Sequence, residues 1–193
     1  MAYFPMLIDM TNLKVLVVGG GAIATEKLEK LIDFTTNITI ISIKVEERAK
    51  ELIEKYGLTL EKRAYIRGDI DGFDIVIVAT DTIELHKAIY EESRDSKTLI
   101  NSVDDTQYCD FIFPSYIKRD DLTIAFSTGG ASPAFAKELR QYIEKIIPQN
   151  VGEFLKEMKA LRKSMPKGKE RMEYFERVVK EYFLSEFKKQ PNS

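Results

Sequence analysis

The chemistry of this sequence is best sought first in a glycine-rich turn near its beginning. The apolar run Val15–Val18 is followed by three glycines, and Ala22 begins a segment with apolar residues at helical spacing. The spacing Gly19-x-Gly21-x-x-Ala24 is the dinucleotide-binding fingerprint, with alanine in its third position. Because the strand, turn and helix that the fingerprint requires surround it in the right order, the pattern predicts a dinucleotide site.

Each position of the fingerprint has a physical role. Gly19 can adopt the tight turn that leads out of the strand, and Gly21 has no Cβ, so that a pyrophosphate can approach the backbone. Ala24 is small enough for the helix to pack closely on the strand. The first backbone N–H groups of the helix, those of Ala22 and Ile23, lack intrahelical acceptors and lie at the positive end of the helix dipole, which suits an anion.

The end of the second predicted strand lacks the residue that commonly selects NAD. A carboxylate about 20 positions after the glycines normally accepts hydrogen bonds from the adenine ribose, but this sequence has Ser42, Ile43 and Lys44 there. Ser42 could bond a ribose hydroxyl and Lys44 could tolerate a 2′-phosphate, whereas Glu46 and Glu47 are assigned to the helix that follows. These residues leave the choice between NAD and NADP open.

Two further strand ends carry polar residues. Thr80 and Asp81 end a buried strand, where ligands bind in parallel sheets, although Asp81 could instead help to begin the next helix. Asn101 and Asp104 end the last parallel strand and should face the same crevice. A carboxylate there can accept or orient a proton near a nicotinamide, while the alternative interpretation is ordinary turn chemistry.

A serine- and glycine-rich segment follows later in the chain. Ser127 to Pro133 supplies hydroxyls and backbone N–H groups before a predicted helix, which makes it a second candidate anion site. Capping of that helix by Ser132, with proline at its first position, explains part of this pattern without any ligand.

The elements that must position these residues alternate between strand and helix. Buried β-branched runs separated by amphipathic segments predict an α/β fold with a Rossmann-like, doubly wound parallel sheet and right-handed crossovers. A less buried strand is predicted over Leu58–Tyr65. A hairpin, a helix and two amphipathic helical segments follow. We expect a cofactor domain over 1–113, a small α+β dimerisation region over 114–147 and a helical region over 148–193.

The amino-acid composition limits the class of protein to which this chain can belong. The 193 residues are 44% hydrophobic and carry a net charge of −2, which allows a packed core in one or two small domains. No run approaches the roughly 18–20 apolar residues that span a bilayer, and residues 1–10 lack the basic start of a signal peptide. Nothing resembles a basic, aromatic-interleaved nucleic-acid surface. We therefore expect a cytoplasmic protein that binds neither membrane nor nucleic acid.

Cysteine, histidine and charge placement add further limits. Cys109 and His86 are the only residues of their kinds, which excludes an intrachain disulfide framework and a cysteine–histidine zinc site and favours structural roles for both. The first 113 residues carry 13 basic and 20 acidic side chains, and the remainder 16 and 11. The basic part could meet an acidic ligand or an acidic subunit surface, or simply be a solvated helical surface.

Four ordered blocks of this sequence resemble one family. YFPMLIDMTNLKVLVVGGGAIATEK, VIVATD, NSVDD…FIFPSYIKR and IAFSTGGASPAFAKELR are similar to precorrin-2 dehydrogenase, the N-terminal module of siroheme synthases. The similarity runs in order from Tyr3 to Ile147 and more loosely beyond. The sequence is expected to lack the methyltransferase domain that is fused in multifunctional members.

The resemblance implies an activity and a set of roles. It implies NAD-dependent oxidation of precorrin-2 to sirohydrochlorin by a homodimer whose interface follows the Rossmann domain. By motif position, the glycine loop takes the pyrophosphate, Ile43 and Lys44 lie beside the adenine ribose, and Asp104 is the catalytic aspartate with Asn101 beside it. Thr128 stands where some members have serine, which leaves the role of that side chain open.

The substrate of this family suits the residues present. Precorrin-2 is a reduced tetrapyrrole with eight carboxylate side chains, and its oxidation needs a hydride acceptor and a proton acceptor, a role that Asp104 can fill. We expect Ser127 to contact the substrate, and basic residues of the second half are candidates for its carboxylates: Lys118, Arg119, Lys137 and Arg140.

Two alternatives stay open at the level of sequence. Some family members also insert ferrous iron, which would then be a substrate rather than a resident metal. In that case Asp104 could accept pyrrole protons, and His86 is a remote ligand candidate. A different class of protein would be a non-catalytic module that senses NAD.

Overall fold

The structure, a computed structural model, describes residues 3–103 and 105–187, so Asp104 lies outside the described residues. The chain divides into two compact units, Tyr3–Ile112 and the part from Phe113 onward. We describe each unit by itself. No helix in the described ranges is long and apolar enough to cross a membrane.

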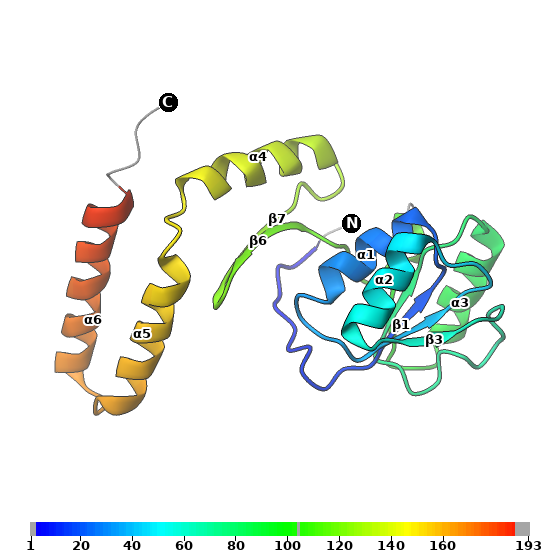
Figure 1. The fold of residues 1–193 in the computed structure, drawn as a ribbon, viewed down its shortest axis with the longest axis horizontal. Helices are drawn as coiled ribbons and strands as arrows, with labels where there is room; N and C mark the ends of the chain where they lie inside the picture. Colours follow the sequence, from blue (N-terminus) through cyan, green and yellow to red (C-terminus); the bar gives the residue numbers. More distant parts are fainter. Residues whose placement is uncertain (1–2, 104, 188–193) are drawn as a thin grey trace. The chain divides into compact units, whose positions relative to one another are not determined.

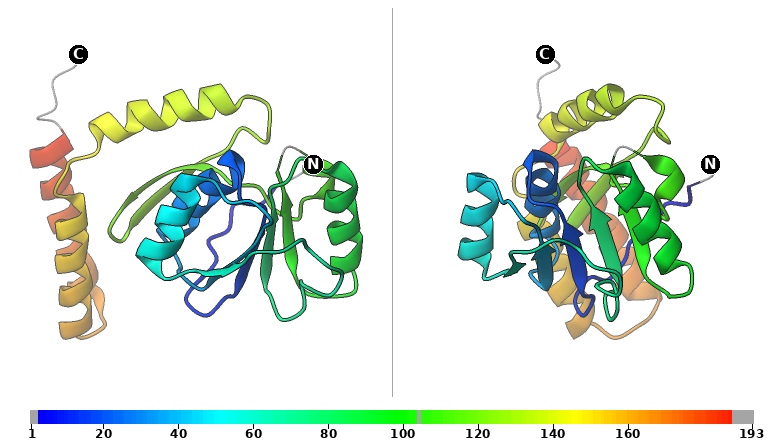
Figure 2. Two further views of the ribbon diagram at one scale, coloured as in Figure 1. Left: turned by 45° about the vertical axis from the view of Figure 1, so that its right-hand side comes forward. Right: turned by 90° about the vertical axis from the view of Figure 1, so that its right-hand side faces the viewer.

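The first unit is a five-stranded parallel sheet with helices on both faces. The strand order is β3-β2-β1-β4-β5, with α1 and α2 on one face and α3 on the other (Figures 1 and 2). This is the doubly wound, Rossmann-like arrangement that the alternation of strands and helices predicts. Its elements are β1 (Val15–Val18), α1 (Ala22–Leu31), β2 (Ile38–Ile41), α2 (Glu47–Tyr56), β3 (Thr59–Glu61), β4 (Ile75–Val78), α3 (Ile83–Ser93), β5 (Leu99–Ser102) and the 3-10 turn η1 (Thr106–Tyr108).

The core of this unit lies along its two central strands. Every residue of β1 and β4 is buried, as expected for strands that are covered on both faces. Burial of each such side chain contributes about 1.5–3 kcal/mol. The two strands pair in register from Val15 with Ile75 to Val18 with Val78, so both end at the same level of the sheet.

The third strand is shorter than the sequence pattern predicts. β3 stops at Glu61, because Arg63 forms a two-pronged ion pair with Asp69, at 2.6 and 2.9 Å, and so holds the following segment in a loop. Glu92 of α3 secures the same loop by accepting hydrogen bonds from the N–H of Gly68 at 2.6 Å and the hydroxyl of Tyr65 at 2.9 Å. These contacts join residues 6 to 27 positions apart, which alternation of residue types along a strand does not reveal.

The second unit is a hairpin followed by three helices. Its elements are β6 (Ser115–Arg119), β7 (Leu122–Phe126), α4 (Pro133–Ile146), α5 (Val151–Ser164), α6 (Lys169–Tyr182) and the π-helical turn η2 (Phe183–Phe187). Ile117, Ile147, Val151 and Tyr182 form its buried core. The ring of Tyr182 stacks on that of Phe154 at 3.9 Å between centroids, and the Tyr182 hydroxyl donates to Asn150 Oδ1 at 2.9 Å.

Arg119 joins the hairpin to the end of α4. Its guanidinium donates to the backbone carbonyls of Ile147 at 2.6 Å, Pro148 at 3.1 Å and Glu144 at 3.0 Å. The last carbonyls of a helix have no intrahelical donor, so this side chain satisfies groups that would otherwise need water. From sequence, Arg119 is a candidate to bind substrate carboxylates, but its donors already face this helix end.

We expect Arg119→Ala to lower the free energy of unfolding by about 2–3 kcal/mol, since three half-buried carbonyls lose a charged donor. Urea unfolding followed by far-UV circular dichroism measures the loss. Lys137→Ala, on the exposed surface of α4, is the matched control and should change stability by less than about 0.5 kcal/mol. Equal effects of the two substitutions would contradict this role for Arg119.

Candidate functional site

The glycine loop leaves β1 by passing very close to the end of β4. Gly19 has φ +120°, a conformation that favours glycine. A Cβ on Gly19 would lie 2.1 Å from the carbonyl oxygen of Ala79, and its N–H donates to the carbonyl of Ile41 at 2.9 Å. The tight turn that the fingerprint predicts for Gly19 is therefore present, and the ends of both neighbouring strands enforce it.

Gly20 is required by the fold, although the fingerprint leaves its position free. A Cβ there would lie 2.5 Å from the carbonyl oxygen of Lys44 and 2.8 Å from Ser42 Oγ. The Ser42 hydroxyl donates to that same carbonyl at 2.7 Å, and the N–H of Glu46 donates to the Gly20 carbonyl at 2.8 Å. The only sequence evidence for this role is the third consecutive glycine, where the fingerprint needs two.

Gly21 differs from its two neighbours because it faces open space. It caps the N-terminus of α1 with φ −85°, and no other part of the protein lies within 4 Å of the Cβ position. The first helical N–H that returns to the loop is that of Thr25, which donates to the Gly21 carbonyl at 3.0 Å. The N–H groups of Ala22 and Ile23 precede it and lack intrahelical acceptors, while Ala24 is fully buried, as close packing requires.

The region of the expected ribose contact lies directly beside this loop. The Ser42 proton is committed to the Lys44 carbonyl, so Ser42 can offer a ligand only a lone pair. Ile43 and Lys44 are exposed. Glu47 begins α2 and its carboxylate pairs with Lys50 at 2.7 Å, in agreement with its assignment to the helix.

A buried histidine ties together the ends of β4 and β5. His86 of α3 is 3% exposed, and its Nε2 lies 2.7 Å from the carbonyl oxygen of Thr80. Because a carbonyl can only accept, Nε2 carries the proton, and Nδ1 accepts from the Ser102 hydroxyl at 2.5 Å. Both ring nitrogens are thus used within the protein, which supports the structural role that the sequence predicts. Asp81 follows Thr80 and is exposed; its side chain does not cap α3.

Asn101 lies at the same edge but faces inward. It is 6% exposed, and its amide nitrogen donates to the carbonyl of Phe111 at 2.9 Å. Cys109 is partly buried, which raises the pKa of its thiol. Burial alone would raise the pKa of Asp110, but hydrogen bonds from Arg94 and from a backbone N–H outweigh that effect and lower it. These contacts hold the segment after β5 against the sheet.

The remaining predicted residues belong to the second unit. The hydroxyls of Ser127 and Thr128 accept from backbone N–H groups of their own turn, at 3.2 and 3.0 Å, and Ser132 caps α4. Arg140 is paired with Glu144 on the next turn of α4. Lys137 is exposed and makes no ion pair with any described residue.

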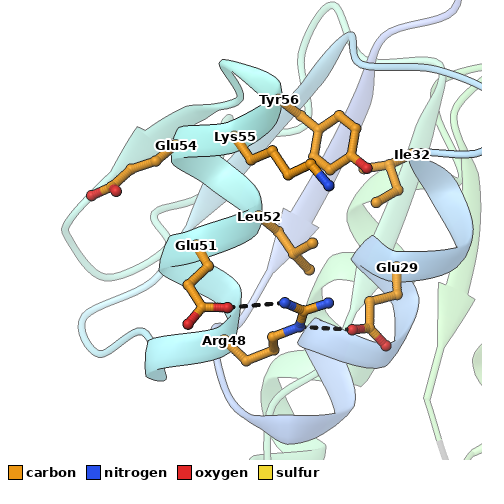
Figure 3. Close-up of a pocket in the computed structure, with 8 residues that line it drawn as sticks. All are labelled: Glu29, Ile32, Arg48, Glu51, Leu52, Glu54, Lys55 and Tyr56. Carbon is orange, nitrogen blue, oxygen red and sulfur yellow. Dashed lines mark hydrogen bonds and ion pairs between the residues drawn. The ribbon is translucent and has the colours of Figure 1, made fainter.

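A separate cavity of about 710 Å³ lies between α1 and α2 (Figure 3). The Arg48 guanidinium inside it bridges Glu29 and Glu51, at 3.0 and 2.9 Å. None of the residues predicted to bind the cofactor lines it. Within the described ranges no three His, Cys, Asp or Glu side chains come close enough together to hold a metal ion.

Gly20→Ala should affect mainly the stability of the fold, and Gly21→Ala mainly the binding of NAD. Gly20→Ala should destabilise the fold by about 2 kcal/mol or more, since its Cβ meets backbone. Gly21→Ala should change stability by less than about 0.5 kcal/mol yet weaken NAD binding at least about tenfold, because the methyl group enters the open space in front of α1. Urea unfolding and calorimetric titration with NAD measure the two effects. Similar stability losses in both variants would contradict this assignment.

For His86→Ala we expect a loss of about 2–4 kcal/mol in the free energy of unfolding, because it removes the partner of the buried Ser102 hydroxyl and of the half-buried Thr80 carbonyl and opens a cavity. Urea unfolding measures it, with Lys87→Ala on the exposed side of α3 as the control. A loss below about 0.5 kcal/mol would contradict the proposed link between the two strand ends.

Known proteins resemble this chain in sequence and in fold. A model described as putative NAD(P)-binding matches residues 6–115, and one described as sirohaem biosynthesis protein central matches residues 119–146. A siroheme synthase of Pseudoalteromonas atlantica is 36% identical over 151 residues, which cover 78% of this chain and 33% of that protein. A siroheme synthase of Methylococcus capsulatus is 34% identical over 183 residues, covering 93% and 39%. The chain thus spans little more than a third of the length of these relatives.

The fold also matches a solved structure titled "SirC, precorrin-2 dehydrogenase", with a TM-score of 0.77 and 22% identity over 97% of this chain and 93% of that one. The resemblance identified from the sequence is confirmed by these matches. Since the first of the two family models covers more than half of its residues, the chain belongs to the putative NAD(P)-binding family.

Proposed function

We propose that the chain oxidises precorrin-2 to sirohydrochlorin with NAD as the hydride acceptor. The observation that carries the proposal is an open pyrophosphate site, at Gly21 and the start of α1, in a chain that resembles a siroheme synthase over 93% of its length. The expectation that the cofactor is a nicotinamide dinucleotide follows from the family to which the chain belongs.

Different residues of the first unit bind the cofactor and accept the proton. Backbone N–H groups of Ala22 and Ile23 bind the pyrophosphate, and Thr80 lies at the adjoining strand end. The bound nicotinamide supplies the hydride acceptor. Asp104 accepts the proton that the substrate loses. It directly follows Val103, whose N–H donates to the Val78 carbonyl at 2.9 Å and so continues the pairing of β4 with β5.

Fewer basic side chains are available to bind the substrate carboxylates than the sequence suggests. Lys137 is exposed and unpaired among the described residues, so we propose that it binds a substrate carboxylate. Arg140 can do so only in competition with Glu144. Ser127 can donate its hydroxyl proton, since its oxygen acts as the acceptor in the turn. Asn101 contributes by fixing the segment up to Phe111.

We also propose that the chain forms a homodimer through α4. This helix fully buries only Ala136 within its own unit. Phe135 is 61% and Tyr142 64% exposed, and Leu139 and Ile146 complete one face at helical spacing. An exposed apolar stripe of this kind marks an interaction surface. A second copy of the same helix would cover it.

The single cysteine is in keeping with a reducing compartment, and we propose a cytoplasmic location.

Iron insertion receives no specific support. His86 was the remote ligand candidate, but both of its ring nitrogens are hydrogen-bonded inside the protein. Ferrous iron therefore enters the proposal only as the substrate of a second reaction for which we assign no residue. Formation of siroheme from sirohydrochlorin and Fe²⁺, with and without the protein, would detect that reaction.

The proposed activity is tested anaerobically with purified protein, precorrin-2 and NAD, following sirohydrochlorin by its absorbance. We expect NAD-dependent conversion. Asp104→Asn should reduce turnover at least about 100-fold, the range of a lost general base, while calorimetry finds NAD affinity within about twofold of the unmodified protein.

Asp105→Asn is the matched control, because the Asp105 carboxylate caps the 3-10 turn η1 by accepting from Gln107; it should retain turnover. Full activity of Asp104→Asn would remove Asp104 from the mechanism. Tight NAD binding without conversion or binding of a tetrapyrrole would instead indicate a sensing module.

A further inference from the structure

A groove of about 490 Å³ lies beyond the end of β2, next to the expected position of the adenine ribose. We propose that it binds a phosphate on the ribose 2′-oxygen, so that the chain accepts NADP as well as NAD. This inference rests on the proposed function, since it concerns the cofactor of the same site. The groove is lined by Ile43, Lys44, Val45, Lys50, Ile53, Glu54, Leu60 and Lys62.

The charge of the groove suits a dianionic group. Three of its four charged residues are lysines, and Glu54 is the only acid. Lys50 pairs with Glu47 at 2.7 Å. Lys44 and Lys62 make no ion pair or side-chain hydrogen bond with any described residue, which leaves two ammonium groups for a ligand. Ammonium groups are effective phosphate ligands as point charges.

The fold brings these two lysines to one edge of the sheet. Lys44 follows β2 and Lys62 directly follows β3, and the two strands are parallel neighbours with Ile41 opposite Glu61. The N–H of Ser42 donates to the Glu61 carbonyl at 3.2 Å, so the pairing of the strands continues up to the point where both lysines leave. Residues 18 positions apart in sequence thereby line one groove.

The end of β2 also lacks a carboxylate that would repel a phosphate. An NAD-selective site places a carboxylate at the end of β2, where it accepts from both ribose hydroxyls and repels a 2′-phosphate. Here that place is held by Ser42, which is uncharged and whose proton is committed to the Lys44 carbonyl. Ile43, which is 63% exposed, adds an apolar surface beside the lysines. An apolar surface next to cationic groups is the combination that an adenosine 2′-phosphate needs.

The test is calorimetric titration of the whole chain at low salt with 5′-AMP and with 2′,5′-ADP, followed by NAD and NADP. We expect 2′,5′-ADP to bind at least about tenfold more tightly than 5′-AMP, as for one or two charged hydrogen bonds. The preference should decrease as ionic strength rises, because both lysines are exposed. Equal affinity for the two nucleotides would overturn the proposal.

Variants assign the effect to residues. Lys44→Glu and Lys62→Glu should each remove most of the preference for 2′,5′-ADP over 5′-AMP, and Lys44→Ala should remove part of it. Lys97→Glu makes the same charge change on an exposed residue just before β5 and should leave the preference intact. A preference that survives both glutamate variants, with folding confirmed by circular dichroism, would also overturn the proposal.

These measurements use no tetrapyrrole, so the two proposals fail separately. A chain that prefers 2′,5′-ADP but does not oxidise precorrin-2 would refute the proposed function alone. A chain that oxidises precorrin-2 with NAD, and binds NADP about 100-fold less tightly than NAD, would refute the phosphate site alone.

Discussion

The structure of the candidate site depends on one steric constraint, the passage of the chain out of β1 between the ends of its two neighbours. Gly19 lies against the Ala79 carbonyl after β4, and Gly20 lies against Lys44 and Ser42 after β2. No side chain fits at either position, so the loop can only bend outward at Gly21. That bend begins α1, whose first N–H groups have no intrahelical acceptor. The anion site is therefore a consequence of how tightly three parallel strands end together.

The parts of this arrangement that depend on local pattern could be predicted from the sequence. Continuous β-branched runs identify strands buried on both faces, and the glycine spacing locates the turn and the helix after it. The role of Gly20 could not be predicted, because the atoms it approaches belong to residues 22 and 24 positions later. The same holds for His86, whose partners are Thr80, just after β4, and Ser102, the last residue of β5. The composition shows only that the sequence has one histidine. Its tautomer and its hydrogen-bond partners depend on tertiary structure.

Charge counts were the least informative part of the sequence. The excess of basic residues after position 113 suggested a surface for an acidic ligand. In the folded unit several of these cations serve the protein itself: Arg119 at the end of α4, Lys156 and Lys159 on the two aspartates of the hairpin turn, and Arg140 on Glu144. Net charge cannot distinguish a cation that neutralises a neighbour from one that is free. The groove beside β2 illustrates the opposite case, because the first unit is acidic as a whole and yet Lys44 and Lys62 there form no ion pair with any described residue.

The missing acid at the end of β2 has a physical cause in the same crowding. Ser42 Oγ lies 2.7 Å from the Lys44 carbonyl oxygen and would lie 2.8 Å from a Cβ on Gly20, so this side chain fills a closed corner of the loop and must donate a proton into it. An aspartate at position 42 would place a carboxylate oxygen against a carbonyl oxygen, with no proton between the two acceptors. The loop that makes room for the pyrophosphate therefore works against an acid beside the ribose. Cofactor selection then falls to residues further along, which here are lysines.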